Sequence, residues 1–245
     1  MGLLHTLFRR SLTREMSTLF VARWRDVEPG VRIINRDVGT TPPSFISEAW
    51  ISAAFTPAEK RTDEQRALLR ESDELIDEVA EADVIAIASP MYNYGMPAHL
   101  KAWVDQVVRI NRTFTFDLAR GDQPLEPILT GKTLVLLTSC GEFAFGPSQA
   151  NEHANHLTPH LKTVSKYLGA SAIHYIGIEY QEFKDSRFEA SKSAALAAVP
   201  ELVLRLTARW PCAARHLTTC GLQKVIACFD GPSVLDQKNI RASPT

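Results

Sequence analysis

The sequence contains no apolar stretch long enough to cross a lipid bilayer, which requires about 20 mostly apolar residues. The best candidate, residues 194–206, is interrupted by a proline, a glutamate and an arginine. The amino end carries a short apolar run followed by two arginines. A secretory signal places its basic residues first and has a longer apolar region. We therefore expect a cytoplasmic protein with no membrane partner.

A large excess of charge of either sign is also lacking. The 27 basic and 28 acidic residues leave a formal net charge of −1. This balance does not favour nucleic acid or an anionic membrane as a partner. Cysteine is scarce too, with four residues in the chain. Cys212, Cys220 and Cys228 recur at a spacing of eight, which matches no zinc site built from close cysteine pairs. We interpret them as incidental thiols and predict no metal site.

Short apolar runs bounded by turn residues are present. Three of them cover residues 84–88, 134–137 and 172–178, and a weaker, more polar run covers residues 31–34. Continuous apolar runs of this length are typical of strands buried on both faces of a sheet. The more polar run is typical of an edge strand.

Segments with helical periodicity lie between these runs. They predict helices over residues 12–25, 57–82, 97–110, 157–168 and 191–210. Strands that alternate with helices imply right-handed crossovers and a parallel sheet. The sequence therefore predicts a doubly wound α/β fold. The tail after residue 210 is not periodic, and we expect it to be loosely ordered.

The loop after the first buried run combines aromatic, amide and glycine residues that could bind a ligand. In an open parallel sheet, ligands bind outside the carboxyl ends of the strands. Tyr92 and Tyr94 offer flat surfaces to a ring, Asn93 can donate and accept hydrogen bonds, and Gly95 frees the backbone. Composition alone leaves a ligand site and an ordinary turn, whose tyrosines cover the core, as equal alternatives.

The loop after the second buried run is small. Ser139 and Gly141 could bring backbone amides close to a ligand. Cys140 lies between them, but it has no Cys-x-x-Cys partner and no histidine nearby in the sequence. A small residue whose main chain matters is therefore the favoured interpretation of Cys140.

These two loops resemble those of the FMN-dependent NADH azoreductases, also called FMN-dependent NADH:quinone oxidoreductases. The stretch SPMYNYGMPAHLKAWVDQVVRINRTFTF, residues 89–116, resembles the P-M-Y-N-F segment of that family, the helix after it and the aromatic T-F strand start. Further similar segments are SDELIDEVAEADVIAIASP, GKTLVLLTSCGE and LTPHLKTVSKYLG, so the resemblance covers about residues 11 to 183.

The resemblance implies a set of FMN-binding residues. The flavin ring would lie against the first loop, and the second loop matches the S-R-G-G stretch of the family. The S-x-S stretch opens the first helix, where the FMN phosphate would meet backbone amides. The implied residues are Ser11, Leu12, Thr13, Met91, Tyr92, Asn93, Tyr94, Ser139, Cys140, Gly141 and Glu142.

Three positions depart from the family pattern within these loops. Tyr94 stands where the family usually has phenylalanine, Cys140 replaces the arginine of S-R-G-G, and Glu142 replaces its second glycine. The contact made by that arginine side chain is therefore not expected here, whereas contacts made by the main chain can persist.

The amino end departs further. The family begins with an apolar strand that is central in a sheet of order 2-1-3-4-5, whereas only ten residues precede Ser11 here and they end in two arginines. We therefore expect a flavodoxin-like doubly wound sheet whose strand 1 is missing or degenerate, as in a truncated form. The expected organisation is an atypical segment 1–10, an FMN-binding domain 11–210 and an atypical, loosely ordered tail 211–245.

The function implied by the resemblance is transfer of two electrons from NADH, through the flavin, to quinones or to aromatic azo compounds. The flavin performs the chemistry, so no catalytic side chain is predicted, and one shared site implies ping-pong kinetics. The family resemblance also implies a homodimer. Three alternatives stay open: a non-catalytic chain with weak or no FMN binding, an FAD-using quinone reductase, and a one-electron carrier, which the near-neutral charge disfavours.

Overall fold

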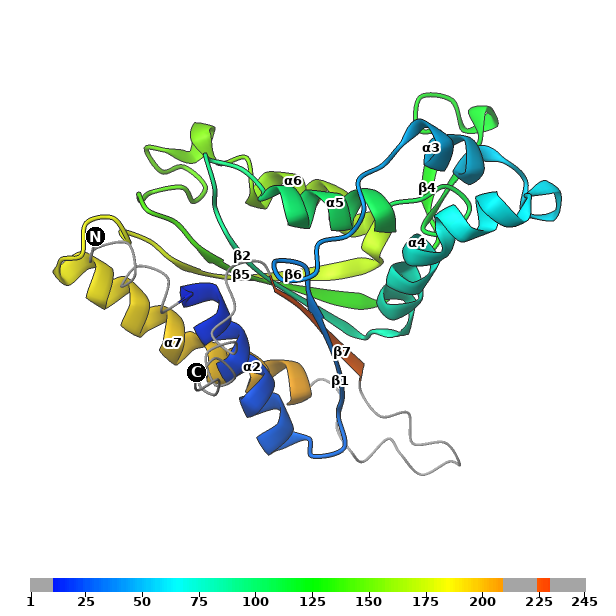
Figure 1. Cartoon of the computed structure of the whole chain (residues 1–245). Helices are drawn as coiled ribbons and strands as arrows, with labels where there is room; N and C mark the ends of the chain where they lie inside the picture. The colour runs from blue at the N-terminus through cyan, green and yellow to red at the C-terminus, as the bar shows by residue number, and fades with distance from the viewer. Residues whose placement is uncertain (1–10, 209–223, 230–245) are drawn as a thin grey trace, which may run out of the picture.

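The computed structural model describes residues 11–208 and 224–229. Five parallel strands form one sheet in the order β1-β7-β2-β5-β6 (Figure 1). A two-stranded antiparallel hairpin, β3-β4, lies outside it. The strands are β1 (Arg32–Asp37), β2 (Val84–Pro90), β3 (Phe114–Phe116), β4 (Leu125–Pro127), β5 (Lys132–Ser139), β6 (Ala170–Ile178) and β7 (Lys224–Phe229).

Helices cover both faces of the sheet. The pair α2 and α7 lies on one face, and α4, α5 and α6 lie on the other (Figure 1). The α-helices are α2 (Leu12–Val27), α3 (Glu48–Phe55), α4 (Asp63–Glu81), α5 (Ala98–Val107), α6 (Thr158–Val164) and α7 (Ser186–Ala208). The short 3-10 helices are η1 (Ala58–Lys60), η2 (Leu118–Arg120), η3 (Glu152–Ala154) and η4 (Ser165–Leu168).

The residues of β2 show why a continuous apolar run predicts a buried strand. Val84, Ala86 and Ala88 point into the cluster formed with α2 and α7. Ile85 and Ile87 point into the cluster formed with α4, α5 and α6. Successive side chains of a strand face opposite sides of the sheet, so both faces of this strand are removed from water, and the predicted parallel, doubly covered sheet is confirmed.

The central position next to β1 is filled from the carboxyl end of the chain. In the order 2-1-3-4-5 this position belongs to the first strand, and here β7 pairs in parallel with β1 on one side and β2 on the other. Val225 is fully buried. The position that strand 1 has in the order 2-1-3-4-5 is therefore occupied by β7, and residues 224–229 form a strand where a loosely ordered tail was expected. Residues 1–10 and the rest of the tail lie outside the described residues.

The other predicted elements are largely confirmed. The strand β1 lies at one edge of the sheet, as its polar character indicates. The run at residues 172–178 forms a strand, as predicted, but the prediction that it is buried on both faces is wrong, because β6 is the other edge strand and exposes Ile173 and Tyr175. The long helix predicted over residues 57–82 is divided into η1 and α4 because Thr62 caps the second helix, where its side chain and that of Gln65 form a capping box. The helix α3 and the strand β4 lie where the sequence predicts no element, whereas β3 coincides with the aromatic T-F strand start implied by the family resemblance. Among the described residues, no helix has the length and apolar character that crossing a membrane requires.

Candidate functional site

The two loops singled out in the sequence lie side by side. The strands β2 and β5 pair with Pro90 opposite Ser139, so both loops start at the same edge of the sheet. Immediately beyond, the amide of Met91 donates a hydrogen bond of 2.8 Å to the carbonyl oxygen of Ser139. The two loops therefore begin in contact with one another at this edge of the sheet.

The first loop is a tight turn with an unusual backbone. The amides and carbonyls of Tyr92 and Gly95 exchange two hydrogen bonds of 3.1 and 2.9 Å. Between them, Asn93 and Tyr94 have φ values of 47° and 66°. Two successive positive φ values define a turn that favours Asn-Gly, and a tyrosine in the left-handed region costs about 1 kcal/mol or more. Retention of that conformation is typical of backbone that shapes a binding site.

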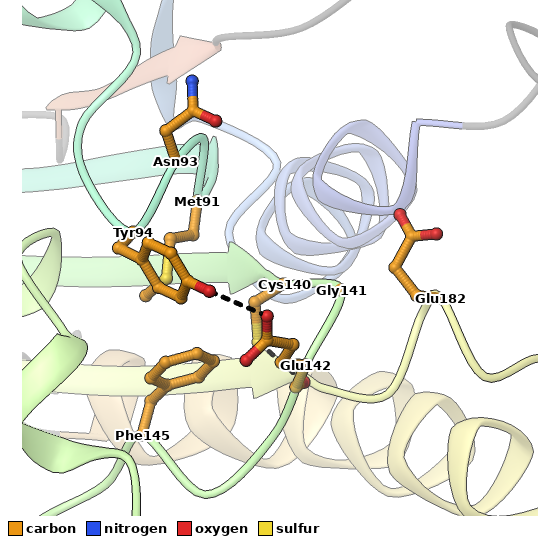
Figure 2. Close-up of a pocket in the computed structure, with 8 residues that line it drawn as sticks. All are labelled: Met91, Asn93, Tyr94, Cys140, Gly141, Glu142, Phe145 and Glu182. Carbon is orange, nitrogen blue, oxygen red and sulfur yellow. Dashed lines mark hydrogen bonds between the residues drawn. The ribbon is translucent and has the colours of Figure 1, made fainter.

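A cavity of about 240 Å³ lies between the loops (Figure 2). Its floor is buried and consists of Cys140 and Phe145. The first loop, the second loop and the turn after β6 form its solvent-exposed rim. The lining residues are Met91, Asn93, Tyr94, Cys140, Gly141, Glu142, Phe145 and Glu182.

The predicted site residues fall into three groups. The cavity is lined by Met91, Asn93, Tyr94, Cys140, Gly141 and Glu142. Tyr92 and Ser139 lie beside these residues in the same loops but do not line the cavity. Ser11, Leu12 and Thr13 do not line it either, and lie at the start of α2.

Two lining residues, Phe145 and Glu182, were missed. Glu182 follows the edge strand β6, so the rule that ligands bind beyond the carboxyl ends of parallel strands also points to it. Phe145 lies three residues beyond Glu142, the last residue of the second loop that the sequence analysis names, and no local pattern marks it.

A hydrogen bond joins the two loops across the cavity. The Tyr94 hydroxyl donates to Oε1 of Glu142 at 3.0 Å, and Figure 2 shows the two side chains pointing toward one another. This hydrogen bond, together with the negative charge of the same carboxylate, raises the pKa of Tyr94. The family pattern has phenylalanine at the position of Tyr94 and glycine at the position of Glu142. The hydrogen bond therefore joins two residues that both differ from that pattern.

Cys140 has the environment of a structural thiol. Its Sγ lies 3.4 Å from the carbonyl oxygen of Glu142 and 3.7 Å from that of Ile178. Burial, and then the negative charges of Glu179 and Glu142, raise the pKa of Cys140 to about 12. The reactive species of a cysteine is the thiolate, so this thiol is poorly suited to nucleophilic or redox chemistry near neutral pH.

We expect Cys140 to react with iodoacetamide roughly a thousandfold more slowly than an ordinary thiol at mildly alkaline pH, because so little of it is ionised. Peptide mass analysis after timed alkylation of the native protein measures this rate. The control is the same reaction in guanidinium chloride, where Cys140 should react at an ordinary rate. Rapid alkylation in the native state would contradict the buried, protonated thiol.

Unpaired backbone donors surround the cavity. Among the described residues, the amides of Asn93, Tyr94, Gly141 and Glu142 donate no hydrogen bond to another part of the chain. A heteroaromatic ring with carbonyl oxygens and ring nitrogens along one edge needs such donors. The exposed Tyr94 ring and the buried Phe145 ring, 6.3 Å apart between centroids, add aromatic surface. The cavity therefore fits the polar edge of a flat heteroaromatic ligand.

The start of α2 lies at the same edge of the sheet. Ser11 is the N-cap, and its Oγ accepts a hydrogen bond of 3.3 Å from the amide of Arg14. The guanidinium of Arg14 reaches Asp37, at the carboxyl end of β1, at 2.7 Å. Burial raises the pKa of Asp37, but hydrogen bonds from Arg14 and Thr40 outweigh it and hold the pKa below its usual value. The ion pair thus fixes a positive helix end at the edge where the cavity lies.

Comparison with known proteins places the fold in a defined class. A family model described as having a flavodoxin-like fold matches residues 4–202. The chain belongs to this flavodoxin-like family, as its sheet and helices indicate.

Within the family, two relatives carry the same name, FMN-dependent NADH:quinone oxidoreductase 2. The one from Colwellia psychrerythraea is 55% identical over 196 residues, which are 80% of this chain and 90% of the relative. The one from Idiomarina loihiensis is 53% identical over 201 residues, which are 80% of this chain and 84% of the relative. The family resemblance drawn from the two loops is confirmed.

Solved structures agree in fold. The crystal structure of the azoreductase AzrA aligns with a TM-score of 0.70 at 17% identity and covers 80% of this chain and 93% of that one. An FMN-dependent NADH-azoreductase from Bacillus anthracis, solved in complex with FMN, aligns with a TM-score of 0.68 at 16% identity and covers 80% and 91%. At these identities the likeness concerns the fold alone.

Proposed function

We propose that this chain is an FMN-dependent oxidoreductase that transfers two electrons per round from NADH to quinones, giving quinols, and, in two such rounds, four electrons to aromatic azo compounds, giving amines. The observation that carries the proposal is the meeting of the two loops at one cavity, shown by the Met91–Ser139 hydrogen bond. The name of relatives 53% and 55% identical to this chain supports the choice of cofactor and of substrates.

The first and second loops would hold the flavin ring through their main chain. The free amides of Asn93, Tyr94, Gly141 and Glu142 would donate to the polar edge of the ring. Tyr94 and Phe145 would border its flat surface. A cavity of about 240 Å³ is smaller than most pockets that enclose a whole ligand, which measure roughly 300–1,000 Å³. It would therefore take the ring and leave the rest of FMN outside.

The start of α2 would hold the phosphate. Its first amides and the hydroxyls of Ser11 and Thr13, 3.2 Å apart, are donors at a positive helix end, which is a ready anion site. Arg14 is committed to Asp37, so the phosphate would depend on the amides and hydroxyls rather than on that side chain.

When bound, FMN accepts hydride from NADH and passes two electrons to the acceptor. The chain's own part is to orient the ring, to cover one side of it and to leave the other side open to both substrates in turn. One shared site predicts ping-pong kinetics. We further propose a homodimer, the commonest symmetric oligomer, and a cytoplasmic location.

The proposal is tested by adding FMN to the purified full-length chain and measuring NADH oxidation with benzoquinone. We expect a yellow protein whose NADH oxidation requires both FMN and the quinone. Double-reciprocal plots should be parallel for the two substrates.

Each alternative predicts a different result in this experiment. A one-electron carrier would stay oxidised on rapid mixing with NADH, and a non-catalytic chain would not retain flavin. Mass analysis of the released flavin separates FMN from FAD. The protein without added FMN is the control.

A further inference from the structure

The charged side chains that line the cavity, among the described residues, are two carboxylates. Glu142 stands at the end of the second loop and accepts the hydrogen bond from Tyr94. Glu182 lies against the backbone of Gly141, since a Cβ added to that glycine would be 2.6 Å from Cγ of Glu182. The two carboxylates therefore flank the second loop, one on each side of Gly141 (Figure 2).

A third carboxylate lies behind the same loop. Oxygens of Glu179 accept hydrogen bonds from the amides of Ala144 and Phe145 at 3.2 and 3.4 Å. The charges of Glu179 and Glu142 both contribute to the raised pKa of Cys140, the thiol on the cavity floor. Glu142 and Glu179 thus both act on the cavity floor, while Glu182 adds a carboxylate on the other side of Gly141.

The described cations in the surrounding elements do not offset this charge inside the cavity. Arg14 pairs with Asp37 at 2.7 Å, Arg187 with Asp185 at 2.6 Å and Lys192 with Glu15 at 2.9 Å. Lys184 is exposed on the turn that carries Glu182, but it does not line the cavity. A cleft lined by charge of one sign extends its field beyond its mouth, so it would act on an acceptor that approaches the open side of the flavin ring.

From this arrangement we infer that the chain selects its electron acceptor by charge. Glu142 and Glu182 favour neutral and cationic aromatic quinones and azo compounds, and disfavour those that carry sulfonate or carboxylate groups. The inference rests on the proposed function. Glu142 stands where the family pattern has glycine, so this selectivity is expected to be a property of this chain rather than of the family pattern.

The test compares naphthoquinone with naphthoquinone sulfonate as acceptors for the FMN-loaded protein. A sulfonate also changes the reduction potential of a quinone. For each variant we therefore take kcat/KM for the sulfonated quinone divided by kcat/KM for naphthoquinone, and we compare this ratio with the same ratio in the parent chain. In this comparison the intrinsic reactivity cancels.

We expect the double variant Glu142→Gln with Glu182→Gln to raise the relative kcat/KM for the sulfonated quinone about tenfold, which corresponds to about 1.4 kcal/mol. Each single variant should give roughly a threefold change. Glutamine keeps the shape and the oxygen that accepts from Tyr94, so only charge is removed. The matched control is Glu201→Gln, an exposed carboxylate on α7 whose side chain is 72% accessible, and it should change nothing.

A second readout does not depend on turnover. The dissociation constants of naphthalene sulfonate and of naphthalene methanol are measured from the absorbance change of bound FMN. In the parent chain the sulfonate should bind at least about tenfold more weakly, and this gap should shrink at high salt because salt screens exposed charges. In the double variant the gap should be small at any salt concentration.

The outcomes separate the two proposals. If the protein reduces naphthoquinone and its sulfonate equally well, and the double substitution does not change their relative kcat/KM, charge selection is overturned. The proposed function then still stands. A protein that retains no FMN, or that reduces no quinone, overturns the proposed function and charge selection with it.

Discussion

Val225→Asp is expected to abolish the stable fold. The parent side chain is fully buried in β7, with Val84 of β2 and Ile33 of β1 as its register partners. An unpaired carboxylate at such a position costs at least about 4 kcal/mol, a large part of the roughly 5–15 kcal/mol that holds a typical domain together. Urea denaturation followed by circular dichroism measures the loss, and FMN retention should disappear with it.

Two further substitutions serve as controls for this test, a milder one at the same position and a charged one near the amino end. Val225→Ala removes apolar volume without adding charge, so it should cost about 1–3 kcal/mol and leave a folded protein. If the central strand came from the amino end instead, Leu4→Asp would be the damaging change and Val225→Asp would be tolerated. That pattern would contradict the placement of β7 between β1 and β2.

Ser11→Asp is expected to weaken FMN binding about 100-fold. Aspartate is as good an N-cap as serine, so α2 should keep its first turn. The new carboxylate would stand at the helix end proposed for the FMN phosphate. Like charges about 4 Å apart near a protein surface repel by up to about 4 kcal/mol, and 100-fold corresponds to about 2.7 kcal/mol. Fluorescence titration of the flavin measures the dissociation constant.

Two controls isolate the phosphate in this experiment. Ser11→Asn keeps an N-cap without charge and should bind FMN within a few-fold of the parent chain. Riboflavin has the same ring and no phosphate, so its affinity should not change in Ser11→Asp. If riboflavin weakened as much as FMN, the effect would lie in the fold or in the ring site, and the phosphate assignment would be wrong.

The sheet could be predicted from the sequence except at its centre. Burial on both faces leaves a local signature in residues 84–88 and 134–137, and both runs form interior strands. Residues 172–178 carry a similar apolar run but form the edge strand β6, which is only partly buried. The stretch Lys224–Phe229 also contains a short apolar run. Its place between β1 and β2 depends on pairing with strands far away in the chain, and local sequence does not encode such long-range pairing. The tail was therefore interpreted by its composition, and its strand was missed.

The sequence predicts those parts of the site whose positions follow from the order and direction of the strands. Loops that follow neighbouring parallel strands must meet at one edge, which is why six of the predicted residues line the cavity. The Tyr94–Glu142 hydrogen bond could not be predicted in the same way. It depends on the two positive φ values at Asn93 and Tyr94, which direct the tyrosine ring across the cavity. No spacing rule foresees a side-chain contact between two loops that depends on such a backbone.

The origin of the central strand has a consequence for synthesis of the protein. On the ribosome, β1, β2, β5 and β6 all emerge before β7, so the nascent chain cannot close its sheet until β7 has left the exit tunnel. Until then β1 and β2 each present an unpaired backbone edge, which is a template for pairing with other chains. The sheet therefore closes only after its other four strands have emerged, and the nascent chain is exposed to aggregation until β7 follows them.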